Sequence, residues 1–145
     1  MTARNGSAGW RGDVRSGAGT VTVGDGVFEG AYSYGSRFGE DAGTNPEQLI
    51  AAAQAACFTM AFTSLLGAEG HPPESVRTNA EVHLRNVEGA PTLVRLDMNT
   101  VANVSGIDEP QLQDYADRAK TGCPVARALA GIPDIVVTAK LGAGV

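Results

Sequence analysis

The sequence is short of the residues that a metal centre or a disulfide framework needs, with two cysteines and two histidines among 145 residues. Neither His71 nor His83 lies at the short spacing that zinc ligands usually show. A structural disulfide is also disfavoured, because intracellular thiols keep cysteines reduced. Cys57 and Cys123 therefore indicate redox chemistry, and we expect neither a metal nor another cofactor.

Positive charge is also scarce, with 11 Lys and Arg against 16 Asp and Glu and a net charge of −5. The basic residues are scattered, whereas nucleic-acid binding requires a basic patch. No secretory leader is recognisable, and the most apolar stretch, residues 49–66, is interrupted by polar side chains such as Gln54 and Thr59. We expect a cytoplasmic protein that binds neither nucleic acid nor a membrane.

The length and hydrophobic content of the chain fit one globular domain. A chain of 145 residues with 43% hydrophobic content is the size of a single domain, residues 1–145. In its first half, residues 9–34 predict a small antiparallel sheet with a tight turn at Gly24-Asp25-Gly26. Residues 35–45 form a predicted glycine-rich loop.

A long helix is predicted to begin at Pro46, with Asn45 as its N-cap and Gln48 placed to complete a capping box. The spacing of its apolar residues predicts one buried stripe. That stripe consists of Leu49, Ala53, Ala56, Cys57, Met60, Ser64 and Leu65.

The second half alternates as strands do in AEVHLRNV and LVRLDMNTVANV, which predicts a hairpin turning near residues 88–91. Asp108 is expected to cap a helix that ends at Gly122, and Cys123-Pro124 opens a short helix through Leu129. The segment IVVTAKL is the last predicted strand. This order of elements predicts an α+β fold with mostly antiparallel pairing.

Three segments form a recognisable combination: SRFGEDAGTNPEQLIAAAQAACFTMAF, VSGID and AKTGCPVARAL. Together they resemble the OsmC/Ohr family of osmotically inducible and organic hydroperoxide resistance proteins, and the resemblance extends over essentially the whole chain. It implies an intertwined homodimer of α+β subunits with antiparallel sheets and a long central helix that carries a reactive cysteine. It also implies reduction of organic hydroperoxides without metal or haem.

Residue by residue, the resemblance makes Cys57 the peroxidatic cysteine and Cys123 the resolving one. Arg37 in SRF and Glu47 in NPE would form the charged pair that activates Cys57. The Ohr branch takes its arginine from nearer the N-terminus, so Arg11 remains an alternative, although the SRFGE motif resembles the OsmC branch.

These residue types suit the chemistry. The nucleophile is a thiolate, and a buried thiol ionises only with help from a nearby cation. A guanidinium stays charged and can be held by a carboxylate. Cys123 precedes Pro124 at a helix N-cap, where its thiolate would face the positive helix end.

Two functions remain open from the sequence. The first is a thiol-dependent peroxidase for organic hydroperoxides, with a dithiol reductant for which the resemblance suggests a lipoyl group. The second is a stress-induced protein that binds a small ligand or senses oxidation without catalytic turnover.

A further expectation concerns assembly. Ten residues of helix separate Glu47 from Cys57 by about 15 Å, so a second subunit would have to supply Glu47.

Overall fold

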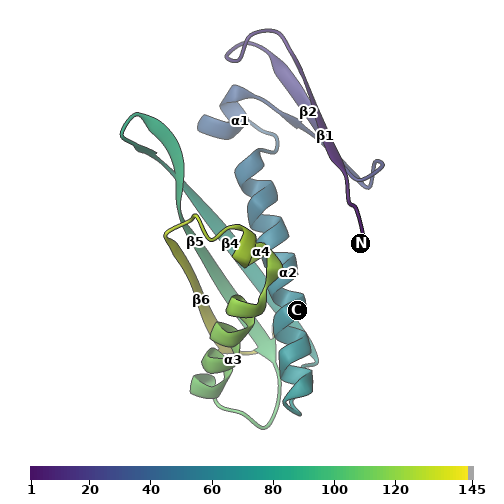
Figure 1. Cartoon of the computed structure of the whole chain (residues 1–145), viewed down its shortest axis with the longest axis vertical. Helices are drawn as coiled ribbons and strands as arrows, with labels where there is room; N and C mark the ends of the chain where they lie inside the picture. Colours follow the sequence, from purple (N-terminus) through teal and green to yellow (C-terminus); the bar gives the residue numbers. More distant parts are fainter. Residues whose placement is uncertain (144–145) are drawn as a thin grey trace. The chain divides into compact units, whose positions relative to one another are not determined.

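The computed structural model describes residues 1–143, and they form two compact units, one ending at Leu49 and one beginning at Ile50. Folding of the chain as one cooperative domain stays a prediction. The elements follow the predicted order of strands, helix, strands, helices and strand (Figure 1).

The N-terminal unit contains a three-stranded antiparallel sheet in the order β1-β2-β3. Its elements are β1 (Gly6–Arg11), β2 (Ala18–Val23), β3 (Phe28–Tyr32) and α1 (Tyr34–Phe38). The predicted turn at Gly24-Asp25-Gly26 joins β2 to β3. Helix α1 corrects the prediction of a loop from residue 35, since two serines cap it reciprocally, Ser33 accepting from the Ser36 N–H and Ser36 from the Ser33 N–H.

Helix α2 (Pro46–Ala68) begins where the sequence predicted, and the Gln48 N–H donates to Asn45 Oδ1 at 2.8 Å. The remaining elements belong to the C-terminal unit. They are β4 (Ser75–Val87), β5 (Ala90–Asn103), α3 (Glu109–Gly122), α4 (Pro124–Ala128) and β6 (Asp134–Leu141). The predicted hairpin is confirmed as β4 and β5, with Glu88 and Gly89 at φ 51° and 85° in its turn.

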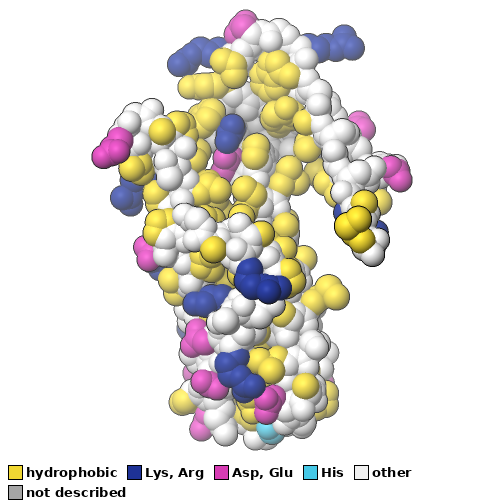
Figure 2. All heavy atoms as spheres, viewed as in Figure 1, with side chains coloured by type: hydrophobic (Ala, Val, Ile, Leu, Met, Phe, Trp, Pro, Cys, Tyr) yellow, Lys and Arg dark blue, Asp and Glu magenta, His cyan; other side chains and the backbone are white. Residues whose placement is uncertain are grey.

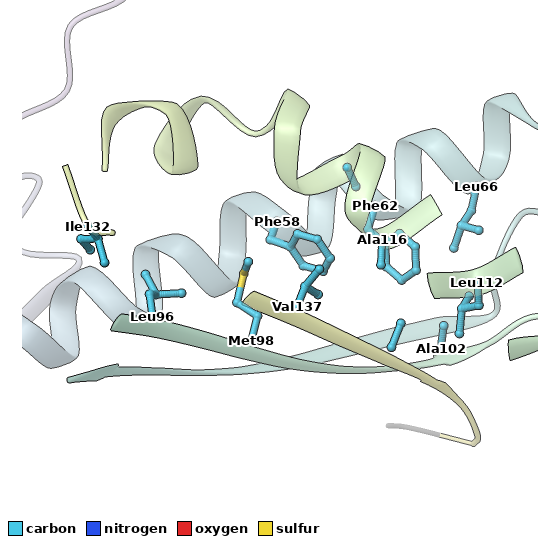
Figure 3. Close-up of a cluster of buried hydrophobic side chains, with 12 residues drawn as sticks. Phe58, Phe62, Leu66, Leu96, Met98, Ala102, Leu112, Ala116, Ile132 and Val137 are labelled. Atoms are coloured by element: carbon cyan, nitrogen blue, oxygen red, sulfur yellow. The ribbon is translucent and has the colours of Figure 1, made fainter. Parts of the chain in front are cut away.

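The sheet of this unit has the order β4-β5-β6, and β6 pairs with β5 in parallel. Helices α2 and α3 lie on one face of the sheet, and the hydrophobic core fills the space between (Figure 3). The α2 side chains in this core include Phe58 and Phe62, whose ring centroids are 5.4 Å apart. From α3, Leu112 and Ala116 are fully buried.

The predicted buried stripe of α2 is wrong for most of its residues, although Leu65 is partly buried against the core. The fully buried side chains are Gln54, Phe58, Phe62 and Leu66. Ala53, Ala56 and Ser64 are exposed, and Met60 is 75% exposed. The helix is apolar on all sides, so hydrophobic periodicity could not select the face that packs on the sheet.

Despite its interrupting polar residues, α2 is long and apolar enough to cross a membrane, judged by length and composition. Core helices of soluble proteins pass the same test.

Candidate active site

The two cysteines meet in the C-terminal unit. Cys57 lies in the middle of α2, and Cys123 lies between α3 and α4. Both are free thiols, and their sulphur atoms are 3.0 Å apart, with Cys123 donating to Cys57. Cys123 is fully buried, whereas Cys57 is partly exposed. Sulphur atoms this close can be joined as a disulfide with little movement of the backbone.

The end of α3 and the start of α4 place Cys123. It is the C-cap of α3, with its N–H bonded to the Lys120 carbonyl, and Pro124 then starts α4. The N-cap position predicted for Cys123 is confirmed, but its sulphur makes no capping hydrogen bond. Instead, the backbone N–H of Val125 donates to the sulphur of Cys57.

The surroundings of Cys57 favour the protonated thiol. Burial raises the pKa of the Cys57 thiol above its ordinary value of 9.0, and the hydrogen bond with Cys123 raises this pKa further. The Val125 N–H lowers the pKa, but the net direction is upward. Because only a thiolate attacks a peroxide bond, Cys57 needs an added cation to react near neutral pH.

Gln54 is a third polar group beside the sulphur atoms, and the sequence analysis missed it. It lies on α2 about one turn before Cys57 and is fully buried. Its Nε2 lies 3.7 Å from Cys123 Sγ and 3.4 Å from Met98 Sδ. In the sequence Gln54 resembles a polar interruption of an alanine-rich run, and no local pattern points to partners so far along the chain.

Arg37 and Glu47 form an ion pair in the N-terminal unit. Arg37 Nη2 and Nε donate to Glu47 Oε1 at 2.8 Å and 3.1 Å, and Nε also lies 3.3 Å from Oε2. The Glu47 side chain is 12% exposed and that of Arg37 39% exposed. The structure thus joins the two residues that the sequence paired. The fork of the guanidinium fixes the geometry of such a pair.

Short hydrogen bonds hold α1 against the start of α2 and so position Arg37. Ser36 Oγ donates to the Thr44 carbonyl at 2.8 Å, and Asn45 Nδ2 donates to the Ser36 carbonyl at 2.8 Å. Asn45 also caps α2, so one side chain fixes both segments. These bonds fix the backbone on either side of the ion pair, next to Arg37 and next to Glu47.

An aromatic cavity of about 470 Å³ adjoins Arg37 within the N-terminal unit. Its aromatic walls are Trp10, Tyr32, Tyr34 and Phe38. Figure 2 shows hydrophobic side chains gathered on this unit. Arg11, the alternative arginine, lines a separate cavity of about 400 Å³ with Trp10 and the first residues of β2. Both arginines therefore border a cavity, and the cavities do not decide between them.

Along α2 alone, Glu47 and Cys57 do not come together. The helix is unbroken between them, so their separation corresponds to about 15 Å of helical rise. Residues 1–143 contain no cluster of three or more His, Cys, Asp or Glu side chains that could hold a metal ion.

Comparison with known proteins identifies the family. The profile of the OsmC-like protein family matches residues 39–138. The chain is 39% identical over 127 residues to the peroxiredoxin OsmC of Escherichia coli, covering 87% of this chain and 89% of that protein. It is 30% identical over 133 residues to the organic hydroperoxide resistance protein OhrB of Bacillus subtilis, covering 85% and 90%.

Comparison with solved structures identifies the same fold. The structure of an organic hydroperoxide resistance protein of Elizabethkingia anophelis matches with a TM-score of 0.77 at 24% identity, covering 97% of this chain and 99% of that one. The α+β architecture predicted from the sequence is therefore confirmed as an OsmC-like fold. The chain belongs to the OsmC/Ohr family.

Proposed function

We propose that this protein reduces organic hydroperoxides to alcohols, with Cys57 as the peroxidatic and Cys123 as the resolving cysteine. The observation that carries the proposal is the contact of two free thiols at 3.0 Å. The names of the relatives, a peroxiredoxin and organic hydroperoxide resistance proteins, support a peroxidase-like role in hydroperoxide defence.

The chemistry proceeds in three steps. The Cys57 thiolate attacks one peroxide oxygen, the O–O bond breaks, and the alkoxide takes a proton to leave as the alcohol. The Cys123 thiolate then attacks the sulphur of the Cys57 sulfenic acid, a disulfide forms, and hydroxide leaves to become water. An external dithiol reduces the disulfide and is itself oxidised, and a lipoyl dithiol fits this requirement.

The cation that Cys57 needs is assigned to Arg37, which Glu47 holds in place. Since α2 separates Glu47 from Cys57 within one chain, we place Arg37 and Glu47 of a second subunit beside Cys57. The exposed face of α2 supports such a homodimer, because Ala53, Ala56 and the largely exposed Met60 would be covered by a symmetry-related helix. Small side chains permit that close approach.

Replacement of Arg37 by methionine tests the assigned cation. Without the guanidinium the Cys57 pKa stays raised, so the fraction of thiolate at neutral pH falls. We expect kcat/KM for tert-butyl hydroperoxide to fall about a hundredfold near neutral pH, which is two pH units of lost ionisation, and to recover as the pH rises. The measurement is the pH profile of kcat/KM.

The matched control is Arg11→Met, which removes the alternative arginine from the same unit. The pH profile of kcat/KM of Arg11→Met should match that of the wild-type protein. A profile that moves in Arg11→Met and not in Arg37→Met would assign the cation to Arg11 instead.

Substrate selectivity follows from the aromatic cavity beside Arg37. Apolar walls favour a hydroperoxide with a hydrocarbon group over hydrogen peroxide, because binding of the group lowers the barrier at the reacting oxygen. We expect kcat/KM for cumene hydroperoxide to exceed that for hydrogen peroxide by at least about a hundredfold, the value of burying a few methylene groups. Equal values for the two peroxides in a steady-state assay with a lipoyl dithiol would contradict an apolar substrate site.

A further inference from the structure

The amide of Gln54 is unusual because it is buried with few hydrogen-bond partners. Gln54 is fully buried, and its Oε1 has no hydrogen-bond partner in the described part of the chain. The hydrogen bonds of its Nε2 within residues 1–143 go to the sulphur atoms of Met98 and Cys123. A buried amide oxygen without a partner destabilises the fold, and sulphur is a weak acceptor.

Packing alone therefore gives a poor reason for a glutamine here. A methionine or leucine would fill the same part of the core beside Phe58 without burying an unpaired oxygen. What an apolar side chain could not provide is the N–H group that faces Cys123. Met98 Sδ carries no hydrogen, so the donor end of the amide is the end that suits this position.

We propose that Gln54 positions Cys123 and stabilises its thiolate while the disulfide with Cys57 forms, an inference that rests on the proposed function and deepens it. The contacts form a directed chain, with Gln54 Nε2 donating to Cys123 and Cys123 donating to Cys57. Each sulphur atom thus accepts one hydrogen bond, and the Gln54 amide is the first donor of the series.

The role arises when Cys57 has become a sulfenic acid. Cys123 must then lose its proton inside a fully buried site, where a bare thiolate is costly. The Gln54 N–H remains on the Cys123 sulphur and offsets part of that cost. Cys123 then attacks the Cys57 sulphur, the S–O bond breaks, and the departing hydroxide and the lost proton make water.

The same contact would direct the reductive step. Cys123 is fully buried and Cys57 is partly exposed, so an external dithiol reaches the Cys57 sulphur of the disulfide. Attack there breaks the S–S bond and leaves its electron pair on Cys123. The sulphur that accepts the electrons is again the one that faces the Gln54 N–H.

The test replaces Gln54 by methionine, which matches its length and lacks the donor. In a Cys57→Ser background Cys123 is the only thiol, and its ionisation can be followed by thiolate ultraviolet absorbance. We expect Gln54→Met to move that titration upward by about one pH unit, as for the loss of a weak hydrogen bond to a charged group. In the protein with both cysteines, decay of the Cys57 sulfenic acid should slow about tenfold near neutral pH.

The rate of this decay, measured by trapping the sulfenic acid after one equivalent of tert-butyl hydroperoxide, should converge with that of the wild type at high pH, where Cys123 is ionised in both. A merely structural effect would slow decay at every pH. The matched control is Thr59→Val on the same helix, which removes a part-buried hydroxyl that donates to Thr78 of β4 at 2.9 Å. It should move neither readout.

An unmoved titration in Gln54→Met would overturn the inference, as would slowing that does not depend on pH. A failure of the proposed function gives a different result, since no sulfenic acid would then form even in Cys123→Ser protein. The titration would still decide the role of Gln54, because it needs no peroxide.

Discussion

Replacing Cys57 by serine is expected to abolish consumption of organic hydroperoxide, with a fall in rate of at least about a thousandfold. A serine hydroxyl at this position has no base to activate it, whereas the cysteine needs only ionisation. Replacing Cys123 by serine should instead allow one turnover, because Cys57 is the only one of the two cysteines that takes part in the first oxygen transfer. The second variant should then stop with a sulfenic acid on Cys57.

The measurement is the amount of hydroperoxide consumed per chain, together with the mass of the peptide that carries Cys57. A mass increase of one oxygen atom is expected in Cys123→Ser after one equivalent of peroxide. Thermal unfolding of both variants serves as the control for folding. Equal loss of activity in both variants, with no trapped sulfenic acid, would contradict the division of roles.

Mixing two inactive variants is expected to restore activity if the active site is shared between subunits. A Cys57→Ser chain still has Glu47, and a Glu47→Ala chain still has Cys57. Equal amounts that exchange freely give heterodimers as about half of all dimers, each with one intact site, so about a quarter of the wild-type activity should return. The measurement is the steady-state rate after subunit exchange.

The control for this experiment is a mixture of Cys57→Ser with Cys123→Ser. The two cysteines meet within one chain at 3.0 Å, so heterodimers of these variants should not recover turnover. Absence of recovery in the first mixture, with exchange verified by mass spectrometry, would place Glu47 outside the site of the partner subunit.

The elements with strong local signals could be predicted from the sequence. Asp108 caps α3 and its side chain accepts from the Gln111 N–H, and the hairpin of β4 and β5 turns at Glu88 and Gly89. Caps and tight turns depend on residues three or four positions apart, so a single sequence contains the information. Helix α1 was missed because it is short and lies in a segment rich in glycine.

Features that depend on distant residues could not be derived in this way. The parallel pairing of β6 with β5 is set by how α3 and α4 return the chain to the sheet. The buried face of α2 was predicted wrongly because the helix is apolar all round. The composition pointed to redox chemistry at Cys57 and Cys123, and the family resemblance gave each its role. The role of Gln54 can be inferred only from the structure, where its amide lies beside Cys123.

The most direct test of the account is the number of hydroperoxide molecules that one chain reduces. Purified protein is given excess cumene hydroperoxide and a lipoyl dithiol, and hydroperoxide loss is followed against the protein concentration. We expect many molecules of alcohol for each chain, since the dithiol returns the Cys57–Cys123 disulfide to two thiols. Consumption that stops at one molecule per chain while dithiol remains would identify a sensor of oxidation, and would contradict an enzyme.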